Sequence, residues 1–224
     1  MKETFEGETQ NVIPPQFPAP NPPADELVWS QQLMQPKVVS KPGGGQWVVI
    51  GAKEALQEGR VGGVLSAISE PLKKGIDGSI RGGLTMQLEG PGTVVVFLLA
   101  WDEGSTPLGG FAIHNLTLVP PQLSSLNSQD AAVWLSDPFK QRGTGMGNYS
   151  AGKPVEFSWS IDQRAPFLRI NASPGGSAGP IDITKVATNG KNIFPAKKMF
   201  ILINAYGWSR NTRLFIDDVK IEEL

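Results

Sequence analysis

The chain contains no cysteine and a single histidine among its 224 residues, and both shortages limit its chemistry. Without cysteine there can be no disulfide, no thiolate nucleophile and no cysteine metal site. Metal-dependent hydrolysis usually needs several histidine or acidic side chains that converge on one ion, and His114 is the only imidazole available. The absence of cysteine leaves the cellular compartment open.

Long apolar runs and an excess of one charge are also missing. No stretch approaches the roughly 18 apolar residues that a membrane-spanning helix requires, and the longest run, residues 94–101, has the length of a strand. The 20 basic side chains are balanced by 21 acidic ones, whereas a nucleic-acid-binding surface needs clustered Lys and Arg. We therefore expect no membrane span and no nucleic-acid partner.

Turn-forming residues and alternating strands dominate what is present. The chain has 26 Gly and 19 Pro, and alanine-rich amphipathic stretches are nearly absent. Apolar and polar residues alternate with period two, and turn signals recur about every ten residues, as is typical of a β-sandwich. The sequence predicts an all-β fold, an antiparallel β-sandwich of jelly-roll type. The clearest predicted strands are 83–88, 93–100, 110–118, 131–135, 155–162, 167–171, 199–204 and 213–221.

The domain organisation follows from the position of a proline-rich stretch. Residues 12–24 contain six prolines, which favour extended, polyproline-like backbone. Too few residues precede this stretch to form a domain of their own, so we expect a surface excursion within one sandwich domain that covers residues 1–224. The best candidate for a helical turn is the stretch 52–58.

The two ends of the chain carry a resemblance. Residues 3–7 read Glu-Thr-Phe-Glu-Gly, and residues 214–221 read Leu-Phe-Ile-Asp-Asp-Val-Lys-Ile. This pairing resembles the β-jelly-roll carbohydrate-binding modules of the galactose-binding-like superfamily, in which such opening and closing strands lie side by side. The likeness extends to concanavalin-like jelly rolls of polysaccharide-degrading enzymes. It implies a poly- or oligosaccharide partner and an extracellular, periplasmic or cell-surface location. Because Met1 and Lys2 are followed at once by acidic residues, the protein is either cytosolic or has lost its export signal.

A metal site is expected where these two ends meet. Counted by twos along the last strand, Asp217 shares a face with Phe215 and Val219, and a carboxylate among apolar side chains is costly unless it is compensated. A nearby Glu6 would add a second negative charge, which calcium could neutralise. The resemblance implies a structural Ca²⁺ at this place. Its expected ligands are Glu6 and Asp217, with Asp218 as a possible third. In the alternative, Asp217 accepts backbone N–H bonds in a bulge and no metal is present.

The candidate ligand residues come from an aromatic loop before the last strand. Sugar recognition commonly uses an exposed aromatic plane flanked by hydrogen-bonding groups. The loop residues with this character are Asn204, Tyr206, Trp208 and Arg210, and Trp134 is a weaker candidate. In the alternative, Tyr206 and Trp208 pack over the open end of the sandwich as a lid. Trp159 lies on an alternating apolar face and is expected in the core.

Catalysis finds little support in the sequence. Residues 175–179 satisfy the G-x-S-x-G pattern, but Pro174 and Pro180 flank them and His114 precedes them, so a turn is expected instead of a nucleophile elbow. The leading hypothesis is a non-catalytic, extracellular carbohydrate-binding module. The second is a polysaccharide lyase or glycoside hydrolase on a concanavalin-like jelly roll, with two acids assembled from distant positions. The third is a structural or adhesive surface protein without a small ligand.

Overall fold

Strand β11 (Val155–Asp162) follows the alternation that its sequence predicts, because buried side chains alternate along it with exposed or half-buried ones. It pairs antiparallel with β12 (Phe167–Ser173) on one side and with β6 (Ser79–Glu89) on the other. The alternation is therefore shared by neighbouring strands, and the sheet has one apolar and one polar face. The computed structural model describes residues 2–3, 28–31, 37–40, 45–51, 64–68, 79–101, 105–136, 140, 142–162, 164–184, 198–206 and 211–223.

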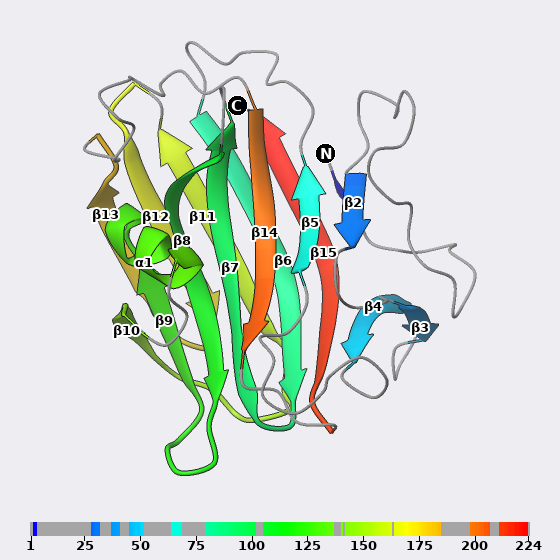
Figure 1. Ribbon diagram of the computed structural model, residues 1–224. Helices are drawn as coiled ribbons and strands as arrows, with labels where there is room; N and C mark the ends of the chain where they lie inside the picture. Colours follow the sequence, from blue (N-terminus) through cyan, green and yellow to red (C-terminus); the bar gives the residue numbers. More distant parts are fainter. Residues whose placement is uncertain are drawn as a thin grey trace.

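The described strands form two antiparallel sheets that lie face to face (Figure 1). Sheet A has the order β13-β12-β11-β6-β15-β4-β3, and β1 also pairs with β15. Sheet B has the order β10-β9-β8-β7-β14-β5-β2. The remaining strands of sheet A are β1 (Lys2–Glu3), β3 (Lys37–Ser40), β4 (Gln46–Gly51), β13 (Ser177–Asp182) and β15 (Arg213–Glu223). Sheet B consists of β2 (Val28–Gln31), β5 (Val64–Ile68), β7 (Gly92–Trp101), β8 (Ser105–Asn115), β9 (Gln122–Leu126), β10 (Thr144–Asn148) and β14 (Lys198–Tyr206).

Strands from distant parts of the chain lie side by side within each sheet. Strand β15 lies between β6 and β4, and β14 lies between β7 and β5. The opening strand β1 pairs antiparallel with the closing strand β15, with Lys2 opposite Lys220 and Glu3 opposite Val219. The predicted proximity of the two ends is thus confirmed for Lys2 and Glu3, while residues 4–7 and the proline-rich stretch 12–24 lie outside the described residues.

The core fills the space between the sheets with aliphatic and aromatic side chains from both. Phe157 of sheet A stacks on Phe111 of sheet B, with ring centroids 4.3 Å apart and an interplanar angle of 14°. Trp159 is 2% exposed, which confirms its predicted place in the core. Its indole lies directly over Gly82 of β6, the residue opposite it in the pairing. Only a residue without a side chain leaves room for the ring.

Residues 128–136 correct the predicted strand at 131–135. They form a helix, α1 (Ser128–Ser136), which begins where Asn127 Oδ1 accepts a hydrogen bond from the Asp130 backbone N–H at 2.8 Å. Such a cap satisfies a free N–H of the first helical turn. The prediction was wrong because a run of five apolar residues cannot by itself distinguish a strand from a short helix. Within the described part of the chain, no helix is both long and apolar enough to cross a membrane.

The last strand corrects a second expectation. Phe215 and Asp217 lie opposite Gln87 and Thr85, but the register then shifts between Asp217 and Lys220. Such a shift is a β-bulge, which inserts one residue and reverses the alternation beyond it. Val219 therefore enters the inter-sheet core and does not share a face with Phe215.

Gly82→Ala should destabilise the fold. A Cβ at position 82 would lie 1.9 Å from Trp159 Cζ2, so the indole would have to move within a filled core. Overpacking of this kind costs about 1–3 kcal/mol of unfolding free energy. Urea denaturation followed by tryptophan fluorescence measures this loss. Gly145→Ala on β10 is the matched control, because a Cβ there meets nothing within 4 Å. Equal stability of the two variants would contradict this account of the core.

Candidate ligand-binding site

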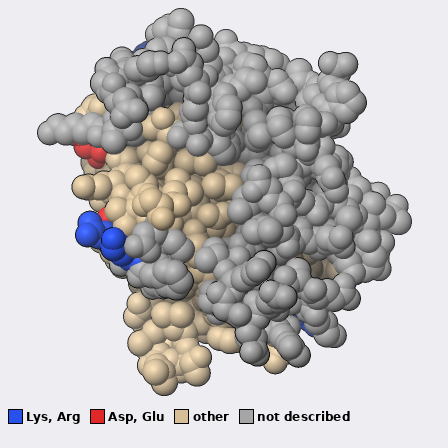
Figure 2. Space-filling view, in the orientation of Figure 1, with Lys and Arg blue, Asp and Glu red and all other residues tan. Residues whose placement is uncertain are grey.

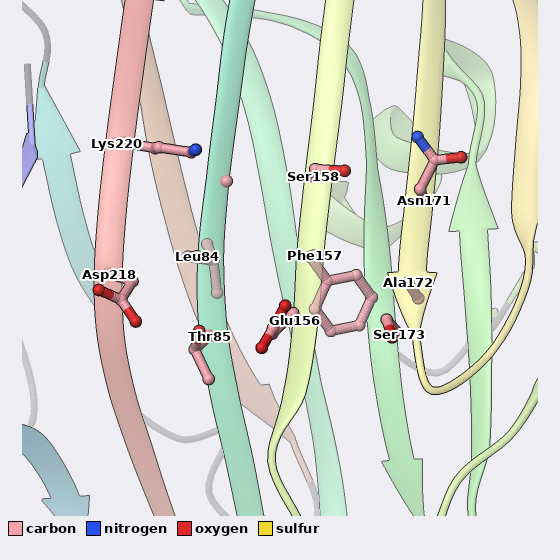
Figure 3. Close-up of a pocket in the computed structure, with 11 residues that line it drawn as sticks. Leu84, Thr85, Glu156, Phe157, Ser158, Asn171, Ala172, Ser173, Asp218 and Lys220 are labelled. Carbon is pink, nitrogen blue, oxygen red and sulfur yellow. The ribbon is translucent and has the colours of Figure 1, made fainter.

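A hollow of about 370 Å³ lies on the outer face of sheet A, over strands β15, β6, β11 and β12 (Figure 3). We call it the sheet-face hollow. Two rows of polar side chains run across the strands, and Gly83 lies in one of them, between Lys220 and Ser158. The Lys220 row consists of Asn171, Ser158 and Lys220. The Glu156 row consists of Ser173, Glu156 and Thr85, together with Asp218 from the bulge.

The hollow exists because small residues occupy the centre of the sheet face. Gly83 of β6 has no side chain, and its partners in the register are Ser158 on β11 and Lys220 on β15. The Cε of Lys220 lies 3.3 Å from the position that a Cβ on Gly83 would take, so the lysine stem passes beside the space that the glycine leaves open. Paired residues on adjacent strands thus build the depression.

The bulge of β15 contributes one of the acids. Asp218 has a φ of 51°, in the left-handed region that Asp and Asn tolerate better than other non-glycine residues. Asp217 next to it is 1% exposed, whereas Asp218 is exposed and lines the hollow. The two adjacent acids therefore have different surroundings, and only Asp218 is accessible from the hollow.

The polar side chains of the hollow have unused hydrogen-bonding capacity. Within the described residues, none of the seven side chains of the two rows makes a hydrogen bond or an ion pair with another residue. Along a strand, residues two apart are separated by about 7 Å, which sets the spacing of the rows. Lys220 can only donate hydrogen bonds, and ionised Glu156 and Asp218 can only accept them. The Lys220 row thus contains one side chain that only donates, and the Glu156 row contains two that only accept.

Of the predicted aromatic residues, Tyr206 lies on β14 of sheet B and Trp134 lies on α1, which packs against that sheet. Trp134 of α1 is 1% exposed, donates its indole N–H to the Arg142 carbonyl at 2.7 Å, and packs against Tyr206 with ring centroids 5.2 Å apart. Tyr206 is also buried, and its hydroxyl accepts a hydrogen bond from Asn204 Nδ2 at 2.9 Å. Burial raises the pKa of Tyr206, partly offset by that hydrogen bond. Neither ring offers an exposed plane to a sugar. Trp208 and Arg210 lie outside the described residues, so their assignment stays a prediction.

His114 of β8 is half-buried beside this cluster. Its Nδ1 lies 3.2 Å from Thr93 Oγ1, its Nε2 lies 2.8 Å from Ser124 Oγ, and its ring is 6.3 Å from that of Trp134. Burial lowers the pKa of His114 to about 4 from its ordinary value of 6.5. Ser177 of the G-x-S-x-G stretch lies on β13 of sheet A, whereas His114 lies on sheet B, so the two do not belong to one sheet.

The expected calcium site is described only in part. Asp217 is buried close to the point where β1 pairs with β15, which suits one of the proposed ligands. Asp218 is exposed in the hollow, and Glu6 lies outside the described residues. Among the residues that the structure describes, no group of three or more His, Cys, Asp or Glu side chains could hold a metal ion. The structural Ca²⁺ stays a prediction.

The sequence contains a signal for the sheet-face hollow that the search for aromatic side chains missed. Glu156, Ser158, Asn171 and Ser173 stand on the exposed faces of two strands that were predicted correctly as a hairpin. Small polar residues on such a face, next to the pair Gly82-Gly83, indicate a depression. Recognising it requires the register between β6, β11 and β15, which joins residues more than 50 positions apart.

Several solved structures are similar to this chain. A structure titled Sialidase is 11% identical with a TM-score of 0.54, over 87% of this chain and 17% of that one. The carbohydrate recognition domain of Emp46p, in a potassium-bound form, is 13% identical with a TM-score of 0.49, over 86% and 87%. Lectin UEA-II complexed with galactose is 10% identical with a TM-score of 0.48, over 100% and 98%. No protein-family model matches the sequence, and no curated protein matches it significantly.

The sialidase comparison shows the fold alone. The chain is a jelly-roll β-sandwich. It spans about one sixth of that sialidase chain, so the activity of the larger protein does not carry over to it.

The lowered pKa of His114 predicts that the folded protein loses stability in acid. The unfolded chain takes up a proton near pH 6.5, but the folded chain does so only near pH 4, so the unfolded state binds more protons between these values. The unfolding free energy should therefore fall as the pH drops from 6.5 to 4, by about 3 kcal/mol from this residue. Urea titrations at several pH values measure the slope. In His114→Gln the slope should flatten, and an unchanged slope would contradict the assignment.

Proposed function

We propose that the protein binds a poly- or oligosaccharide in the sheet-face hollow and does not transform it. The observation that carries this proposal is the pair of polar rows that line the hollow, whose side chains make no hydrogen bond or ion pair with other described residues. Sugar hydroxyls both donate and accept hydrogen bonds, so one ring can use a lysine on one side and a carboxylate on the other. A volume of about 370 Å³ is also within the range of small-ligand sites.

The shape of the hollow favours a chain segment that runs across the strands. The two rows cross β15, β6, β11 and β12, and three intervals between strands cover about 14 Å. Among the described lining residues, the only aromatic is Phe157, whose ring is buried in the core. Binding would therefore depend on hydrogen bonds and not on stacking. An extracellular, periplasmic or cell-surface location is part of the proposal and rests on the resemblance of the terminal strands.

Removing one side chain from each row should abolish most of the binding. The double variant Glu156→Ala/Asn171→Ala loses an acceptor and an amide that face the ligand, at a cost of about 2 kcal/mol or roughly thirtyfold in Kd. A glycan array selects the ligand, and titration calorimetry on the wild type and the variant measures the difference. Both positions are exposed, so the fold should be preserved.

The control Asn148→Ala removes an exposed amide from β10 of the opposite sheet and should bind like the wild type. A wild-type protein that binds no glycan on the array would refute the proposed function. Full binding by the double variant would show that the ligand does not bind in the sheet-face hollow.

A second candidate function rests on the acids of the hollow. Glu156 and Asp218 lie on β11 and β15, with β6 between them, and both line the hollow (Figure 3). Glycoside hydrolases use two carboxylates on either side of the scissile bond. Incubation of the array's best ligand with the protein, followed by chromatography of the products, distinguishes the two functions. We expect intact ligand, and cleavage products that disappear in Glu156→Gln would establish the hydrolase instead.

A further inference from the structure

Charge is distributed unevenly along the strands of the outer face of sheet A. One step beyond the Lys220 row, the register aligns Arg169, Ser160, Arg81 and Glu222 across the same four strands. The Lys220 row and this next row together contain three basic side chains and one acid. The Glu156 row contains two acids that line the hollow, Glu156 and Asp218, and no base. The hollow thus lies on the boundary between a basic zone and an acidic zone.

Lys220 is the basic group closest to the centre of this boundary. It is half-buried, its stem passes beside Gly83, and its side chain points across the hollow toward Ser158 (Figure 3). Within the described residues its ammonium group has no carboxylate within salt-bridge distance. A partly desolvated cation is stabilised by an anionic acceptor, and a ligand can supply one. Arg81 and Arg169 are exposed and add a longer-range attraction for negative charge.

We propose that the hollow selects an acidic sugar, with a single carboxylate that faces Lys220. This inference rests on the proposed function and names the class of glycan. In this orientation the carboxylate accepts hydrogen bonds from Lys220, Ser158 and Asn171, while hydroxyls on the other edge of the ring donate to Glu156 and Asp218. The selection is for a uronate residue within or at the end of an otherwise neutral chain.

The acidic zone limits how much negative charge the ligand carries. In a chain of consecutive uronates, successive rings point their carboxylates to different sides, so some of them would face Glu156 and Asp218. Like charges at this distance repel, and that repulsion offsets the gain at Lys220. A neutral chain leaves the ammonium without a counter-charge. The preferred order is therefore one uronate first, then the neutral chain and the homopolyuronate.

The test compares matched glycans on the whole protein. The probes are tetrasaccharides of xylose, glucose and galactose, each neutral or carrying a single glucuronate, together with tetragalacturonate. We expect the best mono-acidic member to bind about tenfold more tightly than its neutral partner, and this advantage to shrink as salt rises from 50 to 500 mM. Equal binding of the two partners would overturn this inference and leave the proposed function standing. Silence from every probe would also overturn this inference, whereas the proposed function falls only if the glycan array is silent as well.

Variants of Lys220 test whether this residue causes the preference for the mono-acidic glycan. Lys220→Met keeps the aliphatic stem and should remove the mono-acidic advantage, whereas Lys220→Arg should retain most of it. Arg142→Met removes the same charge from an exposed residue before β10 on the opposite sheet and should leave the advantage unchanged. A Lys220→Met protein that still prefers the uronate tenfold would overturn the assignment. Circular dichroism of each variant verifies that the fold is intact.

Discussion

The bulge between Asp217 and Lys220 is the constraint on which both the core and the hollow depend. Strand β15 is the closing strand and also the neighbour of β6, β4 and β1, so its register affects much of sheet A. On one side of the bulge Ile216 faces the core, and on the other Val219 does, because one inserted residue reverses the alternation. The same shift places Lys220 opposite Gly83 and turns Asp218 toward solvent. In a regular strand with Ile216 in the core, Val219 would face outward and Lys220 would face the core.

Local patterns predicted the strands well where a strand has one buried and one exposed face. The range 155–162 coincides with β11, and its pairing with the segment after 166 is confirmed. Failure came where the pattern was short. Residues 131–135 offer five positions, too few to separate period two from period 3.6, and the helix there depends on a cap at Asn127 that lies outside the predicted strand.

The site could be predicted only in fragments, because its parts meet through the long-range register. Asp218 was predicted as a possible third calcium ligand, and a bulge at Asp217 was the alternative, but the sequence did not predict that the bulge turns Asp218 into the hollow. Tyr206 and Trp134 combine aromatic and polar neighbours, which suits a sugar platform, and the same property suits a buried contact under α1. Their burial depends on the packing of α1 against sheet B, which local sequence does not reveal.

The outer faces of the two sheets differ in how far they are covered, and the burial patterns of the strands show this difference. Every residue from Val94 to Ala100 on β7 is buried, because sheet B packs one face on the core and the other on a second apolar cluster with α1. The described surface on this side carries few charges (Figure 2). Strand β11 instead exposes Glu156 and Ser158. A continuous apolar run therefore marks a sheet that is covered on both faces, and strict alternation marks the sheet whose outer face is free for a ligand.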